Sequence, residues 1–251
     1  RFAAARHDEG WRAWDARVLF NELERRPLHF LEIDPAEHVR LYRQGVETVS
    51  LGDVYAGVLV GMHWTGLYRG RWSAPGLRGR LGPHGDGARL QDEVVDAEER
   101  RWITAKRGAW CADEPRSAFE CRLWHNYELL QLWDLLSLYL AVMPPEADSG
   151  DAGRPPRWGP QLSALDHAPQ TVLLPEVRSD PFGPQHTIRV GVRPGGVVVL
   201  DPYPFERPGI TVDVAQRVIA DRAYTPAEME THVRKAPESV TTWRMEPWRT
   251  A

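Results

Sequence analysis

Histidine and aspartate side chains occur at three places in the chain where most of their neighbours are apolar. His7 and Asp8 precede a pair of tryptophans in "RHDEGWRAWD", His63 interrupts "GVLVGMHW", and Asp134 interrupts "LLQLWDLLSLYL". An ionised carboxylate inside a buried helix is costly unless it is paired or coordinated. Asp134 therefore requires a partner, either a cationic side chain or a metal ion.

These four side chains together have the composition of a metal site. Two imidazoles and two carboxylates offer nitrogen and oxygen ligands, which suit Mn, Fe, Zn or Mg rather than a metal that prefers thiolates. A divalent ion would neutralise the carboxylates and lower the pKa of a bound water. The residues thus indicate a divalent metal cofactor held by His7, Asp8, His63 and Asp134.

Each of these residues also has an explanation without a metal. Asp8 caps a helix in this second interpretation, His63 is a core histidine bonded to a backbone carbonyl, and Asp134 belongs to a buried salt bridge. A buried His/Asp hydrogen-bond network accounts for the charges equally well. Trp11 and Trp14, three residues apart, are similarly open to two interpretations, core packing or a stacking wall for a base or sugar.

The overall composition narrows the classes of function. The net charge of −4 and the pI of about 6.2 argue against a general nucleic-acid-binding protein. No run approaches the roughly 18 apolar residues of a membrane span, so we expect no membrane partner. Cys111 and Cys121 lack the spacing of a zinc site or a disulfide framework, and a reducing cytoplasm is the expected location.

Helical patterns dominate the first part of the chain, and strand patterns the last. We expect a helical core over residues 1–145, with a helix beginning at Asp34, an all-apolar helix over 53–66 and another over 122–143. Beyond residue 170, a hairpin (186–200), further strands and a short helix capped by Thr225 follow. The predicted fold is mainly α, with a small C-terminal antiparallel β appendage over 160–251 packed on the same domain, α+β overall.

The order of these motifs resembles known families. A His-Asp pair, a later histidine and a final aspartate on a late helix are similar to the HD superfamily of metal-dependent phosphohydrolases. More closely, "HDEGWRAWD", "RPLHFLEI", "YAGVLVGMHWTGLY" and "LLQLWDLLSLYL" resemble, in order over residues 6–143, a bacterial family catalogued as domain of unknown function 3891. The resemblance assigns His7 and Asp8 to the HD pair, His63 to the intermediate histidine and Asp134 to the final aspartate.

The resemblance implies a divalent-metal-dependent phosphohydrolase that acts on a small phosphoester or nucleotide. Asp8 and His63 would be its catalytic residues, and the Arg-rich stretch over residues 69–80 would steady the phosphate. Both family patterns begin with a histidine upstream of the HD pair. The chain starts six residues before this pair and lacks an initiator methionine, so the upstream histidine either precedes Arg1 or is lost. Its loss would leave the metal site without one ligand. The alternative is a non-catalytic ligand-binding or regulatory protein with a buried His/Asp network and no metal.

Overall fold

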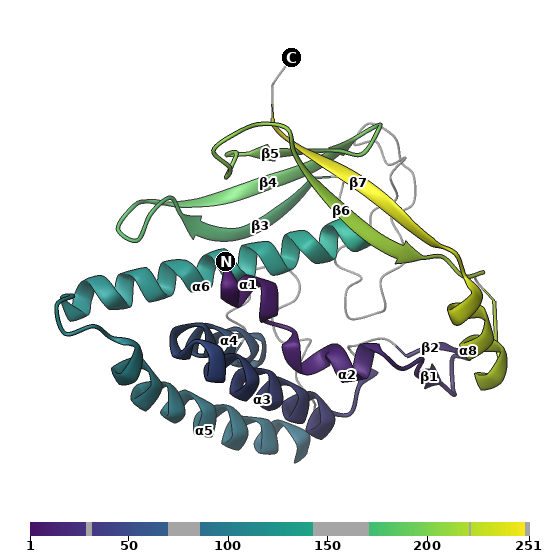
Figure 1. The fold of residues 1–251 in the computed structure, drawn as a ribbon, viewed down its shortest axis with the longest axis horizontal. Helices are drawn as coiled ribbons and strands as arrows, with labels where there is room; N and C mark the ends of the chain where they lie inside the picture. Colours follow the sequence, from purple (N-terminus) through teal and green to yellow (C-terminus); the bar gives the residue numbers. More distant parts are fainter. Residues whose placement is uncertain (29–31, 70–85, 143–170, 221, 249–251) are drawn as a thin grey trace. The chain divides into compact units, whose positions relative to one another are not determined.

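The structure is a computed structural model that describes residues 1–28, 32–69, 86–142, 171–220 and 222–248 (Figure 1). The Arg-rich stretch over residues 69–80 therefore lies almost entirely outside the described residues. The helices are α1 (Phe2–Arg6), the 3-10 helix η1 (Glu9–Trp11), α2 (Arg12–Asp15), α3 (Pro35–Gly52), α4 (Val54–Tyr68), α5 (Asp86–Ala109), α6 (Arg116–Val142) and α8 (Pro226–Lys235). The strands are β1 (Phe20–Asn21), β2 (Arg26–Pro27), β3 (Thr171–Arg178), β4 (Gln185–Arg193), β5 (Val197–Asp201), β6 (Ile210–Arg217) and β7 (Glu238–Pro247).

The chain divides into two compact units whose segments alternate along the sequence. The first unit contains Arg1–Arg12, Asp34–Ser137 and Leu173–Ile188. The second unit contains Ala13–Ile33, Leu138–Val172 and Arg189–Ala251. His7, His63 and Asp134 all belong to the first unit, so the candidate site is formed within a single compact body.

Capping and apolar patterning explain the central helices of the first unit. The Asp34 carboxylate accepts hydrogen bonds from the backbone N–H groups of Ala36 (2.8 Å) and Glu37 (3.3 Å), which confirms the predicted start of α3. Asp53 caps α4 in the same way through the N–H of Ala56 (3.1 Å). Residues 56–66 of α4 are buried, as its all-apolar pattern predicts. No helix among the described residues is long and apolar enough to cross a membrane.

The first fifteen residues form three short helical segments and not one continuous helix. α1 ends at Arg6, and η1 begins at Glu9. Gly10 of η1 packs directly against the backbone of α3, where an added Cβ would lie 1.9 Å from the carbonyl oxygen of Leu41. Gly45 of α3 faces the same crossing, since its Cβ would lie 3.0 Å from the Gly10 nitrogen. This close approach sets where η1 lies on α3 and leaves His7 and Asp8 at the break between the two helical segments.

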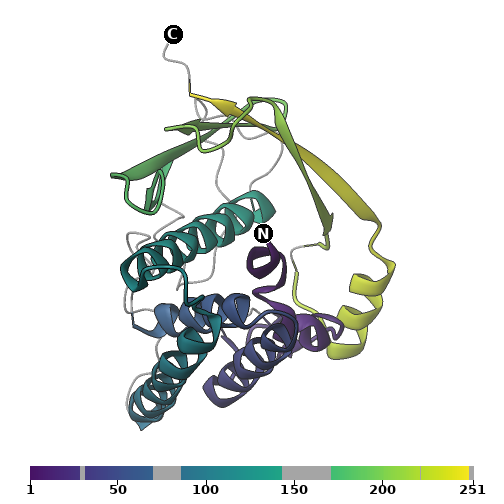
Figure 2. The same cartoon turned by 60° about the vertical axis from the view of Figure 1, so that its left-hand side comes forward.

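The prediction of a mainly α protein with a small antiparallel β appendage is wrong. Five strands form one sheet in the order β3-β4-β5-β7-β6, and Figures 1 and 2 show this sheet strongly curled. β4 and β5 form the predicted antiparallel hairpin, but β5 pairs with β7 in parallel, which makes the sheet mixed. The fold is therefore α+β with a substantial mixed sheet.

β5 is the central strand of the five-stranded sheet, and it connects the predicted hairpin to the remaining strands. Val198, Val199 and Leu200 are each at most 1% exposed, so side chains on both faces of β5 are buried, and β5 has a neighbouring strand on each side. Its parallel neighbour β7 follows β6 and α8 in the chain, so the pairing joins segments that are not adjacent in sequence. The predicted Thr225 cap of α8 is confirmed and forms a capping box, with the Glu228 N–H donating to Thr225 Oγ1 (3.3 Å) and the Thr225 N–H donating to Glu228 Oε2 (2.7 Å).

Candidate metal centre

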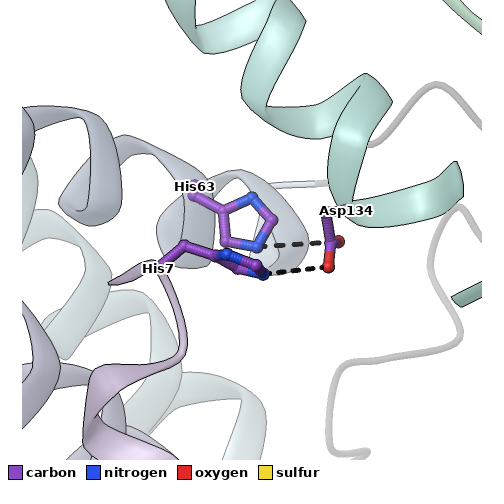
Figure 3. A group of neighbouring side chains, drawn as sticks. All are labelled: His7, His63 and Asp134. Atoms are coloured by element: carbon purple, nitrogen blue, oxygen red, sulfur yellow. Dashed lines mark hydrogen bonds and ion pairs between the residues drawn. The ribbon is translucent and has the colours of Figure 1, made fainter. Parts of the chain in front are cut away.

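Three of the four predicted metal ligands meet within the first unit. His7 comes from the end of α1, His63 from the buried face of α4, and Asp134 from α6 (Figure 3). One donor atom from each lies within 4.8 Å of the others. Both imidazole rings present a nitrogen to the Asp134 carboxylate, as the dashed lines in Figure 3 show.

The hydrogen bonds of His7 determine the state of its ring. Its Nδ1 lies 2.8 Å from the carbonyl oxygen of Ala4, which accepts but cannot donate, so Nδ1 carries a hydrogen. Its Nε2 lies 3.2 Å from Asp134 Oδ1 and 3.1 Å from Asp8 Oδ2. In a neutral His7 ring, the lone pair of Nε2 would therefore face two carboxylates. This arrangement requires a positive charge at Nε2, supplied either by a proton or by a metal ion.

Protonation is the form that the side chains alone favour. Burial lowers the pKa of His7, but hydrogen bonds and charges from Asp134 and Asp8 outweigh it and raise the pKa to about 11. For Asp8, burial acts to raise the pKa, and the opposing hydrogen bond and charge of His7 produce a net lowering. Without a metal, the structure thus describes an imidazolium between two carboxylates at neutral pH.

His63 has the properties of a neutral ligand. Its side chain is 2% exposed, and burial lowers its pKa despite the nearby Asp134 charge. Its Nε2 lies 3.7 Å from Asp134 Oδ2, and its ring meets that of His7 edge to face, with centroids 5.3 Å apart. Its Nδ1 is buried without a hydrogen-bond partner among the described residues. Neutral imidazole is the form of histidine that coordinates metals.

Asp8 occupies a different position from the other three. Its side chain is 57% exposed, compared with 14% for His7 and 10% for Asp134. It touches His7 Nε2 but is not part of the group whose donor atoms all lie within 4.8 Å. The structure therefore brings three predicted ligands together and places Asp8 at the solvent-facing side of His7.

The donor set fits a divalent ion. Zinc and similar ions bind imidazole nitrogens and carboxylate oxygens at about 2.0–2.2 Å, which sets ligand atoms of one ion roughly 3–3.5 Å apart. The separations of 3.2 Å between His7 and Asp134 and of 3.7 Å between His63 and Asp134 are close to these values. In addition, the bond from His7 Nδ1 to Ala4 orients the ring as backbone carbonyls commonly orient metal-binding histidines. Three protein ligands would leave positions for water or substrate.

Two polar side chains near Asp134 on α6 form hydrogen bonds within that helix. Gln131 Nε2 donates to Tyr127 Oη at 2.8 Å, and Ser137 Oγ donates to the backbone oxygen of Asp134 at 2.8 Å. Neither of these two bonds ends on the Asp134 carboxylate. The partners that the carboxylate does have are the two histidines.

An aromatic group beside the site escaped the sequence analysis. His38 and Tyr42, four residues apart on α3, contact Trp11 edge to face, and Tyr42 stacks on Trp64, the neighbour of His63. His38 Nδ1 hydrogen-bonds the Tyr68 hydroxyl. Burial, together with the negative charges of Asp8 and Asp134, raises the pKa of Tyr42. The i, i+4 spacing of His38 and Tyr42 was the sequence signal that could have indicated this group. Trp11 is buried, which agrees with core packing, one of its two interpretations.

His38 predicts a specific dependence of stability on pH. Burial lowers its pKa to about 4, so between pH 6.5 and 4 the unfolded chain binds a proton that the folded chain does not. Stability is therefore lost as pH falls through this window, by about 2 kcal/mol after allowing for the partial exposure of the ring. Urea unfolding of the wild type and of His38→Gln at pH 7 and pH 4.5 measures it. We expect the difference between the two proteins to shift by this amount, and an unchanged difference would contradict a neutral buried His38.

Comparison with known proteins matches the chain to a family model. A family model described as "Protein of unknown function (DUF3891)" matches residues 1–221. Searches of curated proteins and of solved structures found no match. The matched range includes His7, Asp8, His63 and Asp134.

Proposed function

Because the chain belongs to the DUF3891 family, whose description states no activity, we propose a function from the site itself: a divalent-metal-dependent phosphohydrolase of the HD type. Its substrate would be a small phosphoester or nucleotide. The His-Asp pair in "HDEGW", the later His63 and the final Asp134 follow the order of ligands in that superfamily. This likeness supports the assignment of the reaction class, and the geometry supports the assignment of the ligands.

The observation that carries the proposal is the position of His7 Nε2. This atom faces two carboxylates at 3.1 and 3.2 Å while Nδ1 is already used as a donor to Ala4. Close by, the buried and neutral His63 points its own Nε2 to the other oxygen of Asp134. Two imidazole nitrogens and a carboxylate within 4.8 Å of one another, with excess negative charge beside them, are the conditions under which a divalent cation binds.

The proposed roles of the four site residues follow from how deeply each side chain is buried. His7, His63 and Asp134 would hold the ion, which supplies Lewis acidity toward a phosphoryl oxygen when it is bound. Asp8, the exposed member, is placed to accept a hydrogen bond from a water or a substrate that enters from the solvent side, and to complete the ligand set if its side chain turns inward. His63 would orient the reacting group from the buried side. The Arg-rich stretch over 69–80, proposed to contact the phosphate, lies outside the described residues.

A second candidate has an observation of its own. The pKa of His7, raised to about 11 by Asp134 and Asp8 against the effect of burial, allows an imidazolium to balance the carboxylates with no metal. The chain would then be a ligand-binding or regulatory protein whose His/Asp network is structural. The two candidates differ in what occupies the space near His7 Nε2.

Metal content decides between them. We expect full-length protein, stripped with a chelator and incubated with Mn²⁺, Zn²⁺, Fe²⁺ or Mg²⁺, to retain close to one ion per chain for at least one metal, as elemental analysis would measure. His63→Ala and Asp134→Ala should each lose that ion, and the metal-loaded wild type should hydrolyse members of a panel of phosphoesters. His125→Ala is the matched control, because His125 lies on α6 with Asp134 but outside the three-ligand group.

The opposite result is equally clear. A wild type that folds, retains none of these ions and hydrolyses no phosphoester would support the structural network and contradict the hydrolase. Circular dichroism of each variant separates loss of the ligand from loss of the fold.

A further inference from the structure

A pocket of about 630 Å³ lies within the first unit, between α1, the beginning of α4 and the middle of α6. Its walls are mostly apolar and include Ala3–Ala5 from α1, Leu59 from α4, and Leu129, Leu130 and Trp133 from α6. The volume falls within the range of roughly 300–1,000 Å³ that is usual for small-molecule sites. The metal ligands do not line this pocket, and the reaction proposed above does not by itself account for it.

The pocket and the metal site lie along the same faces of the same three segments. Residues four or seven apart share a helix face, one or two turns from each other. His7 keeps right-handed helical backbone angles (φ −61°, ψ −29°), so this relation extends from α1 to His7. Each metal-site residue is related in this way to a residue that lines the pocket: His7 to Ala3, His63 to Ala56, and Asp134 to Leu130.

The direction of this relation is the same on all three segments. From the pocket toward the site, residue numbers increase along α1, along α4 and along α6. Ala4 lines the pocket, and its carbonyl oxygen lies 2.8 Å from His7 Nδ1. Trp133, which also lines the pocket, immediately precedes Asp134. The pocket therefore lies next to the site along these three helical segments.

Few polar groups line the pocket. Asn126 and Tyr55 are already bonded to each other, through a 2.8 Å hydrogen bond from Asn126 Nδ2 to Tyr55 Oη. Asp53 uses a carboxylate oxygen to cap α4, and the remaining charged side chain is that of Arg1. A nucleobase requires several donors and acceptors at defined positions, whereas an alkyl or aryl group requires only apolar walls.

We propose that this pocket receives the apolar body of an amphipathic phosphomonoester, an alkyl or aryl phosphate, whose phosphate group reaches His7, His63 and Asp134. This substrate class rests on the metal-dependent hydrolysis proposed above. The apolar pocket would favour hydrophobic phosphoesters over nucleotides. The apolar walls supply affinity for the body, and the metal-site residues beside the pocket hold the head group.

Two series of ligands test the pocket and the head-group site separately. The n-alkyl alcohols and n-alkyl phosphates from butyl to octyl are titrated into the full chain by calorimetry, with Mn²⁺ and after chelation. We expect affinity to rise about two- to fourfold per methylene in both series, since each buried methylene contributes a similar transfer free energy. Only the phosphates should bind more tightly when Mn²⁺ is present.

A pair of tryptophan substitutions provides the matched control. Leu129 is half-buried in the pocket wall on α6, and Leu67 is half-buried on α4 outside it. Leu129→Trp should fill the pocket and weaken octanol and octyl phosphate binding by about tenfold, the equivalent of roughly two methylenes, while Leu67→Trp should leave both unchanged. His63→Ala should retain the dependence on chain length and abolish the effect of Mn²⁺.

The outcomes distinguish the two proposals. Affinities that do not change with chain length, or that fall equally in Leu129→Trp and Leu67→Trp, overturn the pocket assignment and leave the metal site untouched. Alcohols that bind with the expected dependence, together with phosphates that gain nothing from Mn²⁺, overturn the phosphomonoester and the hydrolase proposal alike.

Discussion

Gly10→Ala is expected to lower the free energy of unfolding by about 3 kcal/mol or more, at the upper end of the cost of overpacking a core. The new Cβ would lie 1.9 Å from the Leu41 carbonyl oxygen and 2.9 Å from the Gly45 nitrogen. Both are backbone atoms of α3, so no side-chain rotation relieves the clash. Because η1 directly follows His7 and Asp8, its displacement should also weaken metal binding. Urea unfolding and metal titration of the same variant measure the two effects.

Gly108→Ala is the control for this substitution. Gly108 lies near the end of α5, where an added Cβ would meet no atom within 4 Å. Alanine there should leave stability unchanged or raise it by up to about 1 kcal/mol, because alanine favours the helix more than glycine does. A Gly10→Ala protein as stable as Gly108→Ala would show that η1 does not approach α3 as closely as described.

Asp134→Asn should destabilise the metal-free protein by about 3 kcal/mol at pH 6. The substitution keeps the size of the side chain but removes the charge that pairs with His7 in a largely buried setting, and breaking such a pair leaves an insufficiently compensated ion. Asp8 remains as a partner of His7, so the loss is not expected to reach the highest values known for buried pairs. The same variant should no longer retain a divalent ion.

The pH dependence of this loss identifies its cause. The folded-state pKa of His7, about 11, exceeds its ordinary value of 6.5, so the stability that the pair contributes is fully present below pH 6.5 and disappears as pH rises through 11. The difference between wild type and Asp134→Asn should therefore shrink between pH 7 and pH 10. A difference that stays constant over this range would contradict an imidazolium at His7.

Asp92→Asn supplies the comparison for an exposed charge. Asp92 is 74% exposed and pairs with Arg69 on the surface of the first unit, where such pairs contribute about 0–1 kcal/mol. Its substitution should change stability much less than Asp134→Asn and should leave metal retention intact. Equal effects of the two substitutions would show that Asp134 acts as an ordinary surface charge.

Local patterns in the sequence were sufficient for the parts of the fold that depend on neighbouring residues. Asp34 and Thr225 act as helix caps because their partners lie two or three residues away, and the burial of α4 follows from its uniform apolarity. The hairpin of β4 and β5 is local in the same sense, with glycines at positive φ in its turn. Such features are set by chain geometry over a few residues.

The sheet and the first helix show the limit of this reasoning. The parallel pairing of β5 with β7 joins strands separated by β6 and α8, and no local pattern specifies which distant strand will complete a sheet. The break after α1 depends on the contact of Gly10 with α3, about thirty residues further along the chain. Both outcomes were decided by packing between segments, where small differences in fit outweigh local preference.

The candidate site depends both on local sequence patterns and on packing between distant segments. The sequence by itself identified His63 and Asp134 as polar residues in apolar surroundings and His7 with Asp8 as their partners, because burying an uncompensated charge is costly wherever it occurs. Only the tertiary structure placed His7 Nε2 between two carboxylates, one of them 127 residues away, and left Asp8 exposed. That arrangement follows from how α1, α4 and α6 pack, since distances between segments far apart in sequence are fixed by side-chain packing and not by helical periodicity.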